Sequence, residues 1–380
     1  MDPELSPDQR LLRETAERFI EASLPLAKLR ELIEAGGEVD PAYRREAAEV
    51  GWFAFLAPES LGGGSVSDAG VLDTVVLAEL RGRYLQPGSF IDTNLAVATL
   101  SREGSEEQQA KILPDLIAGE AAVAWAVADP SGDWSGPAGV HAQAVPGGYR
   151  LTGRKGLVVE AQSAQWLLLT ANTPEGPTQF LLPVSTPGVG VEELRGLDLT
   201  RRLCEVHLDG AVVDGSAVLG RPGQAGAAVD AQIRLAAVLG AAESAGAMQY
   251  LFDLTLQYCK DRVAFGRPIG SFQAIKHQLA DSSLALEMSH AVVTAAAQAV
   301  AAQDRGDQEA ARAAHAASLA NAFVSDAAIE LAHNCWQHFG GISYTWEHDF
   351  HLYLRRLTVD AALYGSPTWH RERVCQLSGV

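Results

Sequence analysis

The segment from residue 258 to residue 281 constrains the fold more than any other part of the chain. Its pattern predicts the end of one long helix, a tight turn at residues 266–270 and the start of another helix. Glycine tolerates positive φ and proline cannot continue a helix, so Gly266, Pro268 and Gly270 mark the break. Arg262 and Gln273 flank this turn. A guanidinium suits phosphate oxygens and an amide both donates and accepts, so the segment predicts a helical hairpin with a candidate anion site.

Charge and cysteine usage restrict the class of protein. The 380 residues carry 47 acidic and 29 basic side chains, a net charge of −18, which argues against binding to nucleic acid or an anionic membrane. The four cysteines are widely separated and no His/Cys spacing fits a metal site, so we expect reduced thiols and no metal. The N-terminus is charged and amphipathic rather than a signal peptide, and no apolar run suggests a membrane span. We therefore expect a cytoplasmic protein.

The pattern of apolar residues changes twice along the chain. Residues 1–120 show helical periodicity, with apolar side chains such as Leu12, Ala16 and Ile20 three or four positions apart. Residues 121–225 consist of short apolar stretches punctuated by glycine and proline, which predicts a small antiparallel β domain. From residue 226 to residue 380 the helical pattern returns and becomes very rich in alanine, which favours closely packed helices. We expect three domains with these boundaries.

Two motifs resemble those of a known family. Residues 262–273 read R-x-x-F-G-x-x-I-x-x-F-Q, and residues 337–347 read Q-x-x-G-G-x-x-x-T-x-E. Together with the order helical, β, helical, they resemble the acyl-CoA dehydrogenase family over essentially the whole chain. The resemblance implies an α+β fold with an N-terminal helical domain, a middle β domain and a C-terminal four-helix bundle. It also implies FAD-dependent α,β-dehydrogenation of an acyl-CoA thioester, with a bulky or branched acyl group in the bacterial branch that this sequence resembles most.

In the family these motifs meet the FAD of a neighbouring subunit. The resemblance therefore implies a homo-oligomer, or a heterotetramer with a paralogous subunit, and an electron-transfer flavoprotein as electron acceptor. Taken singly, each motif has a simpler explanation: the glycine pair could only end a helix, and the arginine could only form an ion pair within its helix. The cofactor candidates implied by the two motifs are Arg262, Phe265, Gln273, Gln337, Gly340 and Gly341.

The sequence departs from the family at the catalytic base, the carboxylate that removes the α-proton. Counting from the motifs, the two usual base positions fall at Tyr364 and at about Ala236, and neither is acidic. Glu243 remains, seven residues after Ala236 and therefore on the same helix face. Its alanine and glycine neighbours predict an apolar setting that would raise its pKa, so Glu243 is the candidate base. The alternative is that Glu243 forms a buried ion pair or a solvated surface contact.

The β domain departs as well. Leu157 and Val159 stand where family members have a tryptophan and a threonine against the flavin, and valine cannot donate a hydrogen bond. Asp129, Ser131 and Trp134 could compensate, with Ser131 as a further cofactor candidate. Two hypotheses follow: an active dehydrogenase with Glu243 as base, or a catalytically incomplete subunit that completes an FAD site shared with another chain.

Overall fold

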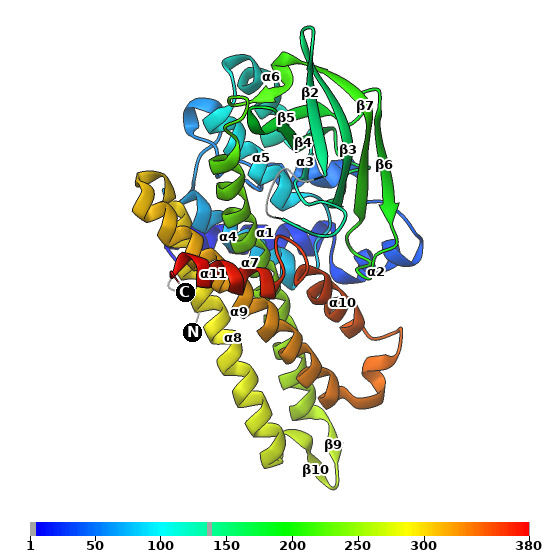
Figure 1. Cartoon of the computed structure of the whole chain (residues 1–380). Helices are drawn as coiled ribbons and strands as arrows, with labels where there is room; N and C mark the ends of the chain where they lie inside the picture. Colours follow the sequence, from blue (N-terminus) through cyan, green and yellow to red (C-terminus); the bar gives the residue numbers. More distant parts are fainter. Residues whose placement is uncertain (1–4, 135–138, 380) are drawn as a thin grey trace.

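The computed structural model describes residues 5–134 and 139–379, which form helices, then strands, then helices (Figure 1). The α+β architecture expected from the sequence is confirmed. The N-terminal part begins with a well-capped helix: Ser6 Oγ accepts a hydrogen bond from Gln9 N, and Ser6 N donates to Gln9 Oε1, both at 3.1 Å. Its helices are α1 (Pro7–Ser23), α2 (Leu26–Glu34), α3 (Pro41–Glu49), α4 (Gly70–Arg83), α5 (Phe90–Glu103) and α6 (Glu106–Ile117).

The middle part is one mixed sheet. Its strand order is β6-β7-β3-β2-β4-β5-β8, with β1 paired to β4. Most neighbours are antiparallel, as expected, but β1 and β2 each pair with β4 in parallel. The strands are β1 (Val123–Ala126), β2 (Val140–Val145), β3 (Gly148–Val159), β4 (Trp166–Thr173), β5 (Gly176–Pro183), β6 (Val189–Leu194), β7 (Leu203–Asp214) and β8 (Val218–Leu219).

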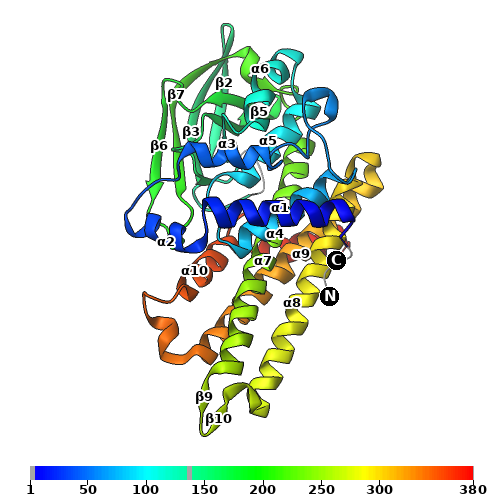
Figure 2. The ribbon, with the colours of Figure 1, turned by 180° about the vertical axis from the view of Figure 1, so that it is seen from behind.

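The C-terminal part is built on three long helices that pack side by side and extend away from the sheet (Figures 1 and 2). A shorter helix, α11, packs across α9, and α10 packs on α7 and α9. The far tip carries a two-stranded hairpin between α7 and α8. The elements are α7 (Gly226–Asp261), β9 (Val263–Ala264), β10 (Arg267–Pro268), α8 (Gln273–Ala301), α9 (Asp307–Phe339), the 3₁₀ helix η5 (Gly340–Tyr344), α10 (Phe350–Asp360) and α11 (Pro367–Leu377).

Helix α8 lies in the most apolar long segment of the described part of the chain. Within the described part of the chain, the segment Gln273–Arg305 is long and apolar enough to cross a bilayer by length and composition. It packs against α7 and α9, yet only 33% of its most apolar window is buried. Leu284 and Met288 remain exposed on it. Because the helix packs as part of a bundle, its length and apolar composition are weak evidence for a membrane span.

Candidate cofactor-binding face and buried charge cluster

The two long helices α7 and α8 are joined at the tip of the bundle by a short β-hairpin, where the sequence predicted only a tight turn. Ala264 pairs with Arg267 across a turn whose two central residues, Phe265 and Gly266, have φ values of 53° and 78°. Positive φ at both positions is typical of a type I′ hairpin turn, and a bulky side chain there costs on the order of 1–3 kcal/mol. The Phe265 ring is nevertheless 95% exposed. The fold therefore presents an apolar ring at a position that is strained and unburied in the single chain.

The second motif lies beside this hairpin. Tyr258, one turn before Arg262, stacks on Phe339 with ring centroids 4.4 Å apart, which brings the ends of α7 and α9 together. Gly340 follows directly with a φ of 63°, and a Cβ atom at Gly340 or Gly341 would have no atom within 4 Å. The structure thus brings both motifs to one end of the bundle. The side chains of Arg262, Gln273 and Gln337 are all exposed on this end.

This face fits part of the FAD that the motifs imply. Arg262 supplies a guanidinium and the two glutamines supply amides, which are suitable donors for phosphate oxygens. The open space over Gly340 and Gly341 would let a ligand approach the backbone closely. The side chains of Arg262, Gln273 and Gln337 are exposed in the single chain and therefore accessible to a ligand.

The side of this chain that would face the flavin ring fits poorly. Trp134 is buried and packs on Trp125 and Tyr364, with ring centroids 5.9 Å and 5.4 Å away. Leu157 and Val159 bring no hydroxyl to this region. Ser131 lies on a loop of the β domain rather than at the bundle tip, and its N and Oγ both donate to Asp129 Oδ1 at 2.8 and 2.6 Å. The structure therefore does not bring Ser131 together with the other cofactor candidates.

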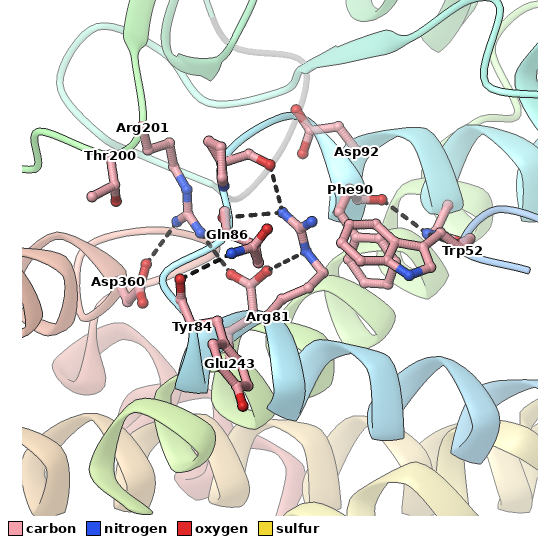
Figure 3. Close-up of polar contacts among 12 residues, drawn as sticks. Trp52, Arg81, Tyr84, Gln86, Phe90, Asp92, Thr200, Arg201, Glu243 and Asp360 are labelled. Atoms are coloured by element: carbon pink, nitrogen blue, oxygen red, sulfur yellow. Dashed lines mark hydrogen bonds and ion pairs between the residues drawn. The ribbon is translucent and has the colours of Figure 1, made fainter. Parts of the chain in front are cut away.

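Glu243 lies in a cluster of buried charges rather than in an apolar pocket (Figure 3). Its Oε1 is 3.2 Å from Arg81 Nε, and its Oε2 is 2.6 Å from Arg201 Nη2 and 3.9 Å from Arg356 Nη1. Arg201 also pairs with Asp360 at 2.6 Å. These contacts join helices α4, α7 and α10 with the loop between β6 and β7.

The apolar setting expected for Glu243 from its helix neighbours was wrong. Burial alone would raise its pKa, but Arg201, Arg81 and Arg356 reverse that effect and hold the pKa of Glu243 below its ordinary value. A carboxylate stabilised in this way is a weak base with both oxygens engaged. Its environment argues against proton abstraction and favours the alternative, a buried ion pair.

The helix crossing explains why Arg81 and Glu243 meet. A Cβ atom on Gly82 would lie 1.7 Å from the carbonyl oxygen of Glu243, and one on Gly246 would lie 1.8 Å from that of Glu79. Only glycine allows α4 and α7 to approach this closely. The glycines therefore set the distance at which the buried ion pair forms.

Asp92 is a buried acid that the sequence analysis missed. Its Oδ2 accepts from Trp125 N at 3.0 Å, and Tyr364 Oη donates to its Oδ1 at 3.4 Å. Burial raises the pKa of Asp92 to about 7, although Trp125, Arg201 and Tyr364 oppose the shift. The available signal was an acid within the apolar stretch that forms α5. Asp92 therefore adjoins Tyr364, one of the two positions where the resemblance led us to look for a base.

Comparison with known proteins agrees with this geometry. Residues 6–120 match the acyl-CoA dehydrogenase N-terminal domain, and residues 227–376 match the acyl-CoA dehydrogenase C-terminal domain. The acyl-CoA dehydrogenase IpdE2 of Mycolicibacterium smegmatis is 32% identical over 368 residues, 96% of each chain.

Two solved structures are also similar. A chain of the ChsE4-ChsE5 complex from Mycobacterium tuberculosis has a TM-score of 0.89 and 26% identity, covering 100% of this chain and 99% of that one. The FAD complex of PigA has a TM-score of 0.89 and 25% identity over the same shares. The chain belongs to the acyl-CoA dehydrogenase family, whose members are FAD-dependent oxidoreductases acting on acyl-CoA thioesters.

Proposed function

We propose that this chain is a subunit of a heteromeric acyl-CoA dehydrogenase and completes an FAD site shared with a paralogous partner. The observation that carries the proposal is a contrast between the two parts of this chain that would contact FAD, the bundle tip and the flavin-ring side. The bundle tip exposes Arg262, Phe265 and Gln273 with no partner surface of its own, whereas the flavin-ring side is filled by Trp134 and Tyr364. The similarity to a chain of the ChsE4-ChsE5 complex is in keeping with assembly from two different chains.

Each group on the tip has a definite task in this proposal. Arg262 neutralises the pyrophosphate of an FAD that lies mainly in the partner, and Gln273 and Gln337 donate to its oxygens. Phe265 packs against the partner and so becomes buried on assembly. FAD held at this face would supply the hydride acceptor for dehydrogenation of the acyl group, with an electron-transfer flavoprotein as the electron acceptor. The base that removes the α-proton comes from the partner chain.

A self-sufficient homo-oligomer with Glu243 as the base is the competing proposal. Its support is that Glu243 is the buried carboxylate of α7, on the same helix face as Ala236. Against it stand the three arginines around Glu243 and the lowered pKa. In that case Glu243 would first have to break its ion pairs with Arg81 and Arg201 before it could accept a proton.

The two proposals differ in where FAD is held, so the test is to purify the chain alone and with a paralogous subunit. We expect a colourless protein alone and a yellow complex with the partner. In the complex, Arg262→Ala should lower the FAD content, whereas Arg312→Ala, an exposed arginine on α9, should not. Stoichiometric FAD in the chain purified alone would contradict the heteromeric proposal and favour the homo-oligomer.

A further inference from the structure

A cavity of about 1080 Å³ lies between the N-terminal helices and the β domain. Its walls come from α2, α3 and the loop between them, the start of α5, and the loops that follow β3 and β6. Figure 2 shows α2 and α3 next to these strands, at the opposite end of the molecule from the β9–β10 hairpin. None of the FAD candidates on the bundle tip lines this cavity. It is therefore separate from the proposed cofactor face, and its volume is that of a small-molecule site.

One wall of the cavity is apolar and rigid. Trp52 and Phe90 meet edge to face with centroids 5.9 Å apart, and Phe53 packs on Phe90 at 6.2 Å. Leu29 and Ile33 of α2 extend this wall. Trp52, Phe53 and Phe90 are each at most 4% exposed and therefore back this wall, whereas Ile33 is partly exposed and can contact an apolar ligand.

Arg81 forms the inner end of the cavity and keeps a donor unused. Its guanidinium carbon lies 4.8 Å from the Trp52 ring centre and 4.6 Å from that of Phe90. Nε pairs with Glu243, and Nη2 donates to the carbonyl oxygens of Gln86 and Pro87 at 3.2 and 3.0 Å. Nη1 donates to no residue in the described part of the chain (Figure 3). Arg81 is only 1% exposed, so this nitrogen can be satisfied only by something inside the cavity.

The acids around the cavity do not compete for this donor, because other groups already engage them. Four are paired with arginines and two accept from backbone N–H groups. These contacts are Glu38 with Arg202, Glu193 with Arg202 at 4.0 Å, Glu120 with Arg45 at 3.8 Å, Asp198 with Arg356 at 2.7 Å, Asp40 with Ala42 N at 2.8 Å, and Glu160 with Arg202 N at 3.1 Å. The lining thus offers a buried cationic donor, Arg81 Nη1, that pairs with none of the carboxylates of the cavity wall.

We infer that this cavity binds a small carboxylic acid with a flat or branched apolar body. The carboxylate accepts from Arg81 Nη1, and the body lies along the apolar lining that Ile33 and Leu199 leave exposed. A buried arginine between two aromatic rings favours a planar anion over a strongly hydrated one such as free phosphate. This site does not depend on the shared FAD site, so either can fail without the other.

The test uses naphthalene-2-carboxylate as the probe and naphthalene-2-carboxamide as its neutral isostere. Isothermal titration of the purified protein should show saturable binding of the acid and at least about tenfold weaker binding of the amide, the equivalent of one charge-assisted hydrogen bond. Arg81→Lys should remove that preference. Arg83→Lys is the matched control, because Arg83 lies on the same helix but pairs with Asp253 and does not line the cavity.

A second variant guards against misfolding of Arg81→Lys. Ser89 lines the cavity at the start of α5, and Ser89→Phe should fill it and abolish binding of both probes while leaving the ion pairs of Arg81 intact. FAD content in the complex should stay unchanged in Ser89→Phe. The proposal is overturned if the wild type gives no saturable heat, if acid and amide bind equally, or if Ser89→Phe binds the acid as the wild type does.

Discussion

Replacing Glu243 by glutamine separates a structural role from a catalytic one. The substitution keeps the shape of the side chain but removes the negative charge that Arg81 and Arg201 approach to 3.2 and 2.6 Å. The three buried arginines of the cluster would then be balanced by two acids, Asp198 and Asp360, instead of three. Breaking a buried ion pair costs about 3–5 kcal/mol because the remaining charge stays desolvated. The amide oxygen still accepts one hydrogen bond, so we expect a loss near the lower end, about 3 kcal/mol.

Urea unfolding followed by tryptophan fluorescence and far-UV circular dichroism measures this loss. If the two probes give coincident transitions, a loss of about 3 kcal/mol with an m-value of about 3 kcal/mol/M lowers the midpoint by about 1 M. Glu330→Gln is the control, because Glu330 is exposed on α9 and should unfold like the wild type. The pH dependence gives a second check. The lowered pKa of Glu243 means that its stabilisation is present above its unfolded pKa and is lost as pH falls through the folded value.

The difference between wild type and Glu243→Gln should therefore shrink in acid. The assembled enzyme carrying Glu243→Gln should keep its turnover per folded complex at temperatures where it remains folded. The reasoning is refuted if Glu243→Gln unfolds within about 0.5 kcal/mol of the wild type, the usual range for a surface change, while bleaching of flavin by acyl-CoA disappears. That result would make Glu243 the base and the cluster incidental.

Three further perturbations test other parts of the structure. Gly82→Ala should lower the free energy of unfolding in urea by about 1–3 kcal/mol, because its Cβ would lie 1.7 Å from the carbonyl oxygen of Glu243. The control is Gly226→Ala, whose nearest contact is at 4.0 Å and which should be neutral or slightly stabilising. Asp92→Asn should gain stability relative to wild type as pH rises from 4 to 7.5 in the same assay. The pKa of Asp92 is raised to about 7 in the folded protein, so the wild type loses stabilisation over that interval. A stability difference that stays constant with pH would contradict this. Phe265→Asn should leave the single chain as stable or more stable, since asparagine tolerates positive φ, but weaken assembly with the partner in sedimentation velocity; unchanged assembly would show that the ring is not in the interface.

The sequence predicted the fold well for identifiable reasons. The change from helical to alternating periodicity is long enough to be read without a structure, and two spaced motifs marked the family. The sequence predicted local structure less well where only a few residues determine the backbone geometry. The hairpin at Phe265 and Gly266 has strands of only two residues each, too short for any periodicity.

The charge cluster shows why the site was harder to predict than the fold. Along α7 the neighbours of Glu243 are alanine and glycine, and local sequence therefore predicts an apolar environment. Its actual partners, Arg81, Arg201 and Arg356, lie more than 40 residues away in every case. Nothing in periodicity or spacing indicates that such distant side chains converge. Asp92 was missed for the same reason, because only the folded chain brings Tyr364 and Trp125 to it.

The same cluster has a consequence for how the molecule comes apart. Arg81 belongs to the N-terminal helices, Arg201 to the β domain, and Glu243, Arg356 and Asp360 to the C-terminal helices. Opening any one of the three regions would leave buried charges uncompensated in the other two. Partial unfolding of a single region is therefore penalised, and the amide protons nearest the cluster should exchange only through opening of the whole chain. A protein of this size would otherwise lose its domains one at a time. We therefore expect these few ion pairs to couple the three regions during unfolding, which would limit the partly open forms available to proteases.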